Sequence, residues 1–202
     1  DEEDSLTPNI ESQVKDLIHY LVLDVVMSEK DGIVPIEYYA DRSTILDQVV
    51  EKFEQIWGEY AEERLAEADQ ILGNQTPDEI AYPNLKDWIK KDLFSYHIDT
   101  FKNTPVLWKM TTERLLSDAD RSGFSCFVDF HQLGDSLFDQ ISNRYLEANK
   151  SALRERRSSA NQRQSDDSLS TSERSEASEE FEHYTNALEQ LTQFDEVNQD
   201  LS

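Results

Sequence analysis

The chain has 202 residues, of which 43 are acidic and 19 are basic, giving a net charge of −24. This length accommodates one domain with an appendage, and such a negative charge weakens binding to nucleic-acid phosphates in dilute buffer, because that binding relies on Lys and Arg. No apolar run approaches the roughly 20 residues of a membrane span, and a single cysteine, Cys126, excludes an internal disulfide.

The acidic residues are spread along the whole chain, and Lys is scarce. Two interpretations compete: an ordinary acidic soluble protein, and a halophilic protein whose carboxylates stay hydrated in concentrated salt. We favour the halophilic one. The Debye length falls to about 3 Å near 1 M salt, so the charge then opposes phosphate binding less. The chain starts at Asp1 without a recognisable signal peptide, and we expect a cytoplasmic fragment or an excised domain.

Hydrophobic periodicity predicts helices through most of the first third of the chain. The first spans residues 10–28, with Asn9 as its N-cap. Residues 33–36 form a short extended piece. A second helix begins at Ser43, and residues 60–72 continue as helix.

The middle of the chain combines one helix with two strands. Asn84 is expected to cap a helix over residues 85–102. The apolar segments 105–110 and 124–130 predict two strands of a small antiparallel hairpin. The first strand begins at its proline or lies at an edge, because proline cannot donate to a ladder. Residues 111–122 form a polar loop between the strands.

The C-terminal part is predicted to form a helical hairpin. Residues 136–157 have helical spacing, and residues 179–202 present an apolar face that is expected to pack on that helix. The Ser-rich stretch 158–178 between them buries too little surface to offset its ordering entropy, so we expect a flexible linker or a frayed helix. The fold class is therefore mainly α: a helical domain over residues 1–157 with a small antiparallel β-hairpin near residues 105–130, and a C-terminal helical hairpin.

Seven residues in the middle of the chain occur in a specific order along a helix, two strands and a second helix. They are Phe94, His97, Phe101, Pro105, Trp108, His131 and Tyr145. The order resembles the C-terminal region of large adenine-specific DNA methyltransferases, the PglX proteins of BREX phage-defence systems and their type IIG restriction–modification relatives. In that family a "FF..H...F" helix runs into an "RPIYW" strand, and a "HR" dipeptide precedes a helix ending in "YL".

Two positions depart from the family pattern. Thr104 and Gln132 each stand where the family usually has Arg, so two positive charges are missing here. The resemblance extends loosely over residues 10–200, but only the middle is specific. It implies a haloarchaeal parent enzyme that transfers a methyl group from S-adenosylmethionine to adenine in DNA.

The motifs of catalysis are missing from the sequence itself. An adenine methyltransferase needs a Gly-rich cofactor loop and an Asn/Asp-Pro-Pro-Tyr/Phe motif that holds the flipped adenine. The chain has five glycines and no Pro-Pro pair. We therefore assign no catalytic residue and no cofactor site to it, and S-adenosylmethionine is implied only for the parent enzyme.

Metal and histidine chemistry is not indicated either. No Cys/His spacing suits zinc, and we expect no metal site. His97 and His131 are interpreted as structural residues, and Cys126 as a small buried side chain. His19 and His183 have no polar constellation around them in the sequence.

Residues 144–163 are locally basic, with six basic and two acidic side chains. One interpretation is the usual preference of a helix C-terminus for cations. The other is contact with the DNA backbone, which positions a protein without reading sequence. The candidates for that contact are Arg144, Lys150, Arg154, Arg156 and Arg157.

These observations favour a non-catalytic C-terminal domain of an adenine-specific DNA methyltransferase from a phage-defence or restriction–modification system. Such a domain would brace the catalytic or target-recognition domains and touch the DNA backbone. Its partner would be the methyltransferase domain of the same system or parent chain, with no membrane involved. The alternative is a stand-alone acidic α-helical protein-interaction module.

Overall fold

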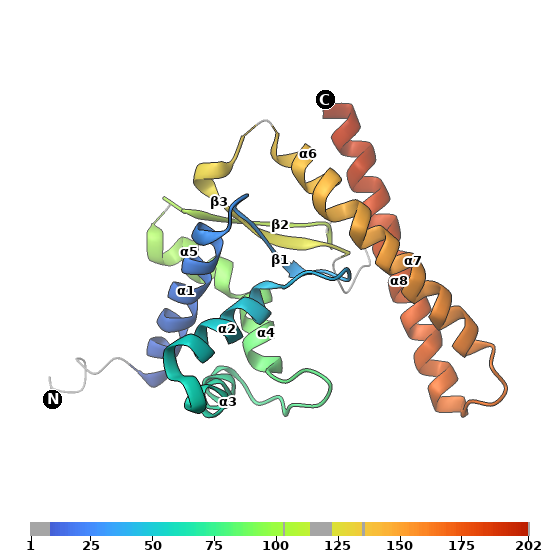
Figure 1. The fold of residues 1–202 in the computed structure, drawn as a ribbon, viewed down its shortest axis with the longest axis horizontal. Helices are drawn as coiled ribbons and strands as arrows, with labels where there is room; N and C mark the ends of the chain where they lie inside the picture. The colour runs from blue at the N-terminus through green and yellow to red at the C-terminus, as the bar shows by residue number, and fades with distance from the viewer. Residues whose placement is uncertain (1–8, 103, 114–122, 135, 202) are drawn as a thin grey trace, which may run out of the picture. The chain divides into compact units, whose positions relative to one another are not determined.

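The computed structural model describes residues 9–102, 104–113, 123–134 and 136–201, and Figure 1 traces their helices and strands. The chain divides into two compact units. Unit 1 comprises Asp1–Ile36, Ser43–Lys109 and Phe127–His131, and unit 2 comprises Glu37–Arg42, Met110–Cys126 and Gln132–Ser202. The fold is mainly α-helical with one small sheet, as the sequence predicts.

The sheet has three strands in the order β1-β3-β2, which are β1 (Ile33–Glu37), β2 (Leu107–Thr111) and β3 (Ser125–Asp129). The Thr112 N–H donates to the Phe124 carbonyl, and the Phe130 N–H donates to the Val106 carbonyl. The partners run in opposite directions, so β2 and β3 are antiparallel and the predicted hairpin is confirmed. The extended piece at residues 33–36 becomes a third strand, and its Pro35 lies on an edge strand, where a missing donor is tolerated.

The described residues of unit 1 form the α-helices α1 (Ile10–Ser28), α2 (Ile45–Trp57), α3 (Ala61–Leu72), α4 (Pro83–Lys91) and α5 (Leu93–Phe101). A short 3-10 turn, η2 (Gly58–Tyr60), joins α2 to α3. Asn9 caps α1 as predicted, by accepting from the N–H of Glu11 at 3.2 Å. The second helix starts at Ile45, two residues later than expected, because Thr44 and Asp47 form a capping box. The apolar helix faces form one core with Leu107 and Phe127.

The single helix expected at residues 85–102 is two helices, α4 and α5, which meet at Asp92. Asp92 has a φ of −110°, away from the helical value near −63°. Asn84 does not cap the helix either. Instead Asp69 of α3 accepts from the N–H of Leu85 and from Nδ2 of Asn84, both at 2.8 Å. The N-terminus of α4 is thus satisfied by a distant carboxylate that local sequence does not reveal.

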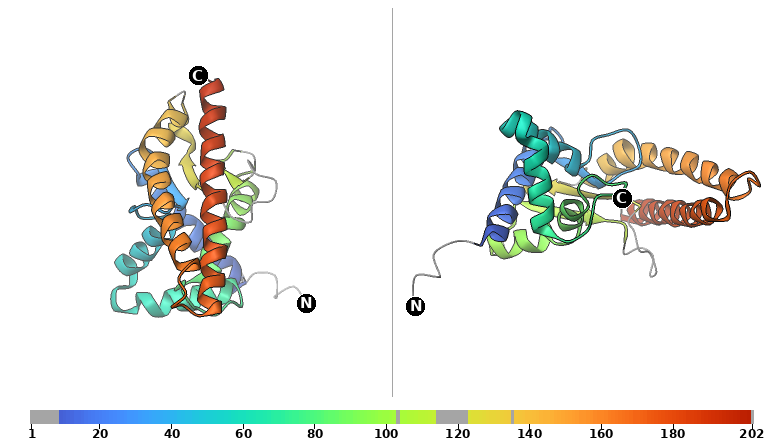
Figure 2. Two further views of the ribbon diagram at one scale, coloured as in Figure 1. Left: turned by 90° about the vertical axis from the view of Figure 1, so that its right-hand side faces the viewer. Right: turned by 90° about the horizontal axis from the view of Figure 1, so that it is seen from below.

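Unit 2 contains α6 (Leu137–Ile141), a π-helical turn η5 (Ser142–Leu146), α7 (Glu147–Gln164) and α8 (Thr171–Leu201). The predicted helix at residues 136–157 therefore contains a π turn, and it continues to Gln164. Figure 2 shows α7 and α8 side by side, and the two helices pack along each other. None of the described helices is long and apolar enough to cross a bilayer.

Most of the stretch expected to be a flexible linker, residues 158–178, is helical and belongs to α7 and α8. Ala160 and Ala177 are fully buried, and their small side chains add to the packing of the pair. Ser170 and Glu173 form reciprocal capping hydrogen bonds at the start of α8. The expectation counted only large apolar side chains and so missed these contacts. Residues 114–122 of the predicted polar loop lie outside the described residues.

Candidate functional site

Four aromatic side chains of unit 1 form a partly exposed row, which we call the aromatic row. Its members are Phe94 on α5, Trp108 on β2, and Phe130 and His131 on the 3-10 turn η4 (Phe130–Gln132). Neighbouring ring centroids lie 6.0 Å apart for Phe94 and Trp108, 6.5 Å for Trp108 and Phe130, and 5.9 Å for Phe130 and His131. Trp108 is 41% exposed and Phe130 is 45% exposed. An aromatic surface therefore faces solvent.

The backbone explains why these rings point outward. Successive residues of a strand face opposite sides of the sheet, so Trp108 is exposed while its neighbour Leu107 is fully buried. The N–H of Phe130 donates to the carbonyl of Val106 at 2.9 Å, which keeps η4 beside the start of β2. Asp129 accepts from the N–H of His131 at 2.9 Å. The row is thus built on hydrogen-bonded backbone.

A buried histidine pair joins α5, the helix that carries Phe94, to α1. His19 on α1 and His97 on α5 are joined by a hydrogen bond of 2.9 Å between Nε2 of His19 and Nδ1 of His97. The ring of Phe101 lies 4.6 Å from that of His97, centroid to centroid. Burial lowers the pKa of His97 to about 4, and the neighbouring His19 acts in the same direction. His97 is therefore neutral at pH 7, as befits a structural residue.

The fold brings together six of the seven residues that carry the family resemblance. Phe94, His97 and Phe101 lie on α5, Pro105 leads into β2, Trp108 lies on β2, and His131 follows β3. The seventh, Tyr145, belongs to unit 2, where it is fully buried and lies under the guanidinium of Arg42 at 4.3 Å.

Two members of these clusters were not predicted. Sequence reasoning gave no role to His19 or Phe130. His19 follows Ile18 on the apolar side of α1 and is 5% exposed. A histidine within a buried stripe is a signal for a polar partner elsewhere in the chain. Phe130 had no such signal, because its exposure depends on where η4 begins.

Two of the five basic candidates are engaged within unit 2. Lys150 is 7% exposed and forms ion pairs with Glu147, at 3.2 Å, and with Asp195. Arg156 donates to the carbonyl of Tyr39 at 3.2 Å and lies over the Tyr39 ring. The charged groups of Lys150 and Arg156 are therefore already engaged in contacts within the protein.

The other three candidates differ in their surroundings. Arg144 and Arg154 are exposed, and Arg157 is half-buried. Within the described residues, Arg154 and Arg157 have neither a hydrogen bond nor an ion pair. These two guanidinium groups are the ones that remain available to an external anion.

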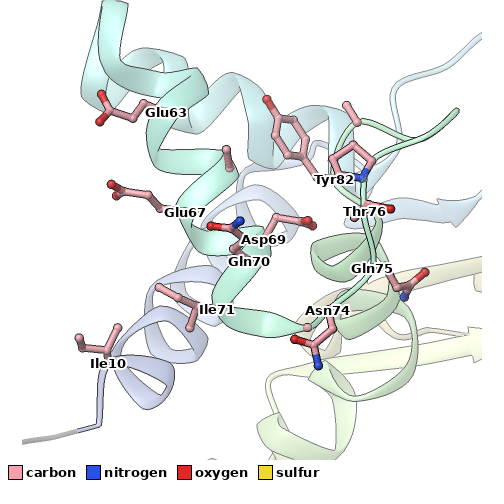
Figure 3. Close-up of a pocket in the computed structure, with 14 residues that line it drawn as sticks. Ile10, Glu63, Glu67, Asp69, Gln70, Ile71, Asn74, Gln75, Thr76 and Tyr82 are labelled. Atoms are coloured by element: carbon pink, nitrogen blue, oxygen red, sulfur yellow. The ribbon is translucent and has the colours of Figure 1, made fainter.

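An open hollow of about 970 Å³ in unit 1 borders α3 and residues 73–82 (Figure 3). Glu63, Glu67 and Gln70 line its helical side, and Tyr82 lies across from them. The buried carboxylate of Asp69 also borders it, but both oxygens already accept hydrogen bonds from the start of α4. The hollow is therefore acidic at its rim and offers no chemistry beyond that charge.

Among the described residues, no group of three or more His, Cys, Asp or Glu side chains could hold a metal ion. Cys126 is fully buried in β3 and forms no disulfide. No protein-family model matches the chain, and a search of curated proteins finds no relative. Its function is therefore inferred from the side chains themselves.

Proposed function

We propose that this chain is a non-catalytic C-terminal domain of an adenine-specific DNA methyltransferase, which it braces by docking through the aromatic row. The observation that carries the proposal is the exposed, stacked pair of Trp108 and Phe130. Aromatic residues are enriched at the centres of protein interfaces, where Trp and Tyr supply much of the binding energy.

The arrangement of the motif residues supports the same proposal. Residues that resemble the methyltransferase pattern are scattered between Phe94 and His131 in sequence, but the fold gathers them around the junction of α5 and β2. A set of motif residues that served only to pack the core would not need an exposed tryptophan. An outward-facing Trp108 fits a surface that meets another domain of the parent enzyme, whose catalytic part would bind S-adenosylmethionine.

Contact with the DNA backbone is a second part of the proposal. We assign it to Arg154 and Arg157, because Lys150 and Arg156 already serve contacts within unit 2. Such contacts position a protein on DNA without reading its sequence. The negative charge of the chain opposes these contacts in dilute buffer, and salt that screens this repulsion also weakens the attraction between Arg and phosphate, so the contact is expected to be weak and secondary to docking through the aromatic row.

The test uses this chain and the catalytic region of the methyltransferase encoded with it, produced as separate polypeptides in molar KCl. Calorimetry measures their affinity, and labelled S-adenosylmethionine with unmethylated DNA measures methyl transfer. We expect binding, and no methyl transfer by this chain alone. Trp108→Ala should weaken binding about tenfold or more, which corresponds to about 1.4 kcal/mol for one interface anchor.

The matched control is Tyr20→Ala, which removes another exposed aromatic ring of unit 1, on α1 and outside the row. Its affinity should equal that of the unmodified chain. Equal losses from both variants, or no binding to the catalytic region, would contradict the proposal. Binding of a protein unrelated to methylation would instead favour the stand-alone interaction module.

A further inference from the structure

The histidine pair forms a continuous hydrogen-bonded link from α1 through α5 to β2. Nε2 of His19 lies 2.9 Å from Nδ1 of His97. The other ring nitrogen of His97, Nε2, faces the backbone N–H groups of Val106 and Leu107 at 3.2 and 3.3 Å. His97 is fully buried and His19 is 5% exposed, so water cannot readily replace these bonds.

The backbone N–H groups that face His97 determine which ring nitrogens of the pair carry a proton. An N–H group can only donate, so Nε2 of His97 must be an acceptor and carries no proton. A neutral imidazole then has its proton on Nδ1, and this proton is donated to Nε2 of His19. His19 in turn carries its own proton on Nδ1. Every nitrogen of the link therefore has a single role.

An additional proton has no compatible position in this link. On Nε2 of His97 it would face the two N–H groups of β2, and on Nε2 of His19 it would face the Nδ1–H of His97. Either arrangement places donor against donor in a buried site, which costs the full desolvation penalty of the unsatisfied groups. Acidification must therefore break one of the bonds.

The groups around the pair do not remove this conflict. Asp16, one turn before His19 on α1, accepts from the hydroxyl of Tyr96 on α5 at 2.5 Å. The carboxylate of Asp16 favours a charged His19, but burial is the larger effect and lowers the pKa of His19. The rings of Tyr96 and Phe101 pack edge-on against His19 and supply no acceptor to the link.

We propose that the His19–His97 link is an acid-sensitive contact, which we call the latch. It holds the start of β2 against α5 at neutral pH and breaks when one proton is taken up. Because Phe94 lies on α5 and Trp108 on β2, the broken link no longer fixes the distance between these two rings of the aromatic row. This last consequence rests on the proposed function, whereas the release itself does not.

The direction of the pH effect follows from linkage. His97 has an ordinary pKa of 6.5 and a folded-state pKa of about 4. A base whose pKa is lowered by folding binds more protons in the released state, so the latch is fully closed above about pH 6.5 and weakens as the pH falls towards 4. Between these values, the equilibrium constant that favours the closed over the released state should fall about tenfold for each unit by which the pH is lowered.

The test is nuclear magnetic resonance of the full chain between pH 7.5 and 4.5, without any partner. Imidazole nitrogen shifts report the tautomers, and hydrogen exchange reports the protection of the Val106 and Leu107 amides, corrected for intrinsic exchange. We expect the Nδ1–H tautomer of His97 at pH 7.5. Protection of both amides should fall about tenfold per pH unit below pH 6.5, while the core amide of Ile89 stays protected.

The matched variant is His19→Gln/His97→Gln, because glutamine keeps one donor and one acceptor but does not titrate. It should make the two amides insensitive to pH, whereas His183→Gln in unit 2 should leave the transition in place. Unchanged protection in the unmodified chain would overturn the proposal. So would a transition that persists in the double variant, or simultaneous loss of protection at Ile89, since the release would then not be local.

Discussion

Gly123 lies so close to the backbone of Ala187 that a methyl group added to it would meet the Ala187 carbonyl oxygen at 2.6 Å. The N–H of Gly123 donates to Oε1 of Gln190 at 2.7 Å, and its carbonyl accepts from Nδ2 of Asn149 at 2.8 Å. Within unit 2, the segment that leads into β3 is therefore held by side chains of both α7 and α8.

This close approach predicts that Gly123→Ala destabilises the protein. The neighbouring atoms are helix backbone, which cannot move aside as a flexible side chain can, so we expect a loss of about 1–3 kcal/mol. Urea denaturation measures it. Gly134→Ala is the control, because a methyl group there meets nothing within 4 Å. Equal stability of the two variants would show that the α8 backbone yields.

The packing of α8 on α7 predicts a difference between two positions on α8. Leu191 is fully buried, whereas Val197 is 51% exposed. Leu191→Ala should cost about 2–5 kcal/mol because it leaves a cavity. Val197→Ala should stay within about 0.5 kcal/mol, as at surface sites generally. Thermal or chemical melts compare them, and similar effects would mean that α8 is not docked on α7 in solution.

The ion pair of Lys150 predicts a third contrast. Asp195→Asn leaves a buried ammonium with Glu147 as its remaining anionic partner. Since Lys150 is almost inaccessible to water, we expect a loss of about 1–3 kcal/mol. Glu147→Gln, which removes a largely exposed partner, should cost at most about 1 kcal/mol. A reversed order in urea denaturation would argue that Glu147, rather than Asp195, holds the charge of Lys150.

Salt should stabilise the whole chain. With a net charge of −24, repulsion between like charges opposes the compact state, and added salt screens it. The melting temperature should therefore rise from low to molar KCl, as followed by far-ultraviolet circular dichroism. Glucose at equal osmolality is the control for solvent exclusion. A melting temperature that is flat or falls with KCl would contradict the prediction.

Local patterns were sufficient for much of the fold. The periodicity of residues 10–28 indicates a helix, Asn9 marks its start, and the apolar segments beginning at residues 105 and 124 predict an antiparallel hairpin. These features follow from the local order of apolar and polar residues, so the sequence itself encodes them. It also determined that the chain is acidic and contains no methyltransferase motif.

Contacts between distant residues decided the rest. His19 and His97 are 78 positions apart, and only the packing of α1 on α5 makes each the partner of the other. The same is true of Asp69, which caps α4 from α3, and of Lys150, whose charge is directed to Asp195 rather than to solvent. Hydrogen bonds and ion pairs of this kind depend on burial and orientation. Neither has a local signature, because both are properties of the folded chain as a whole.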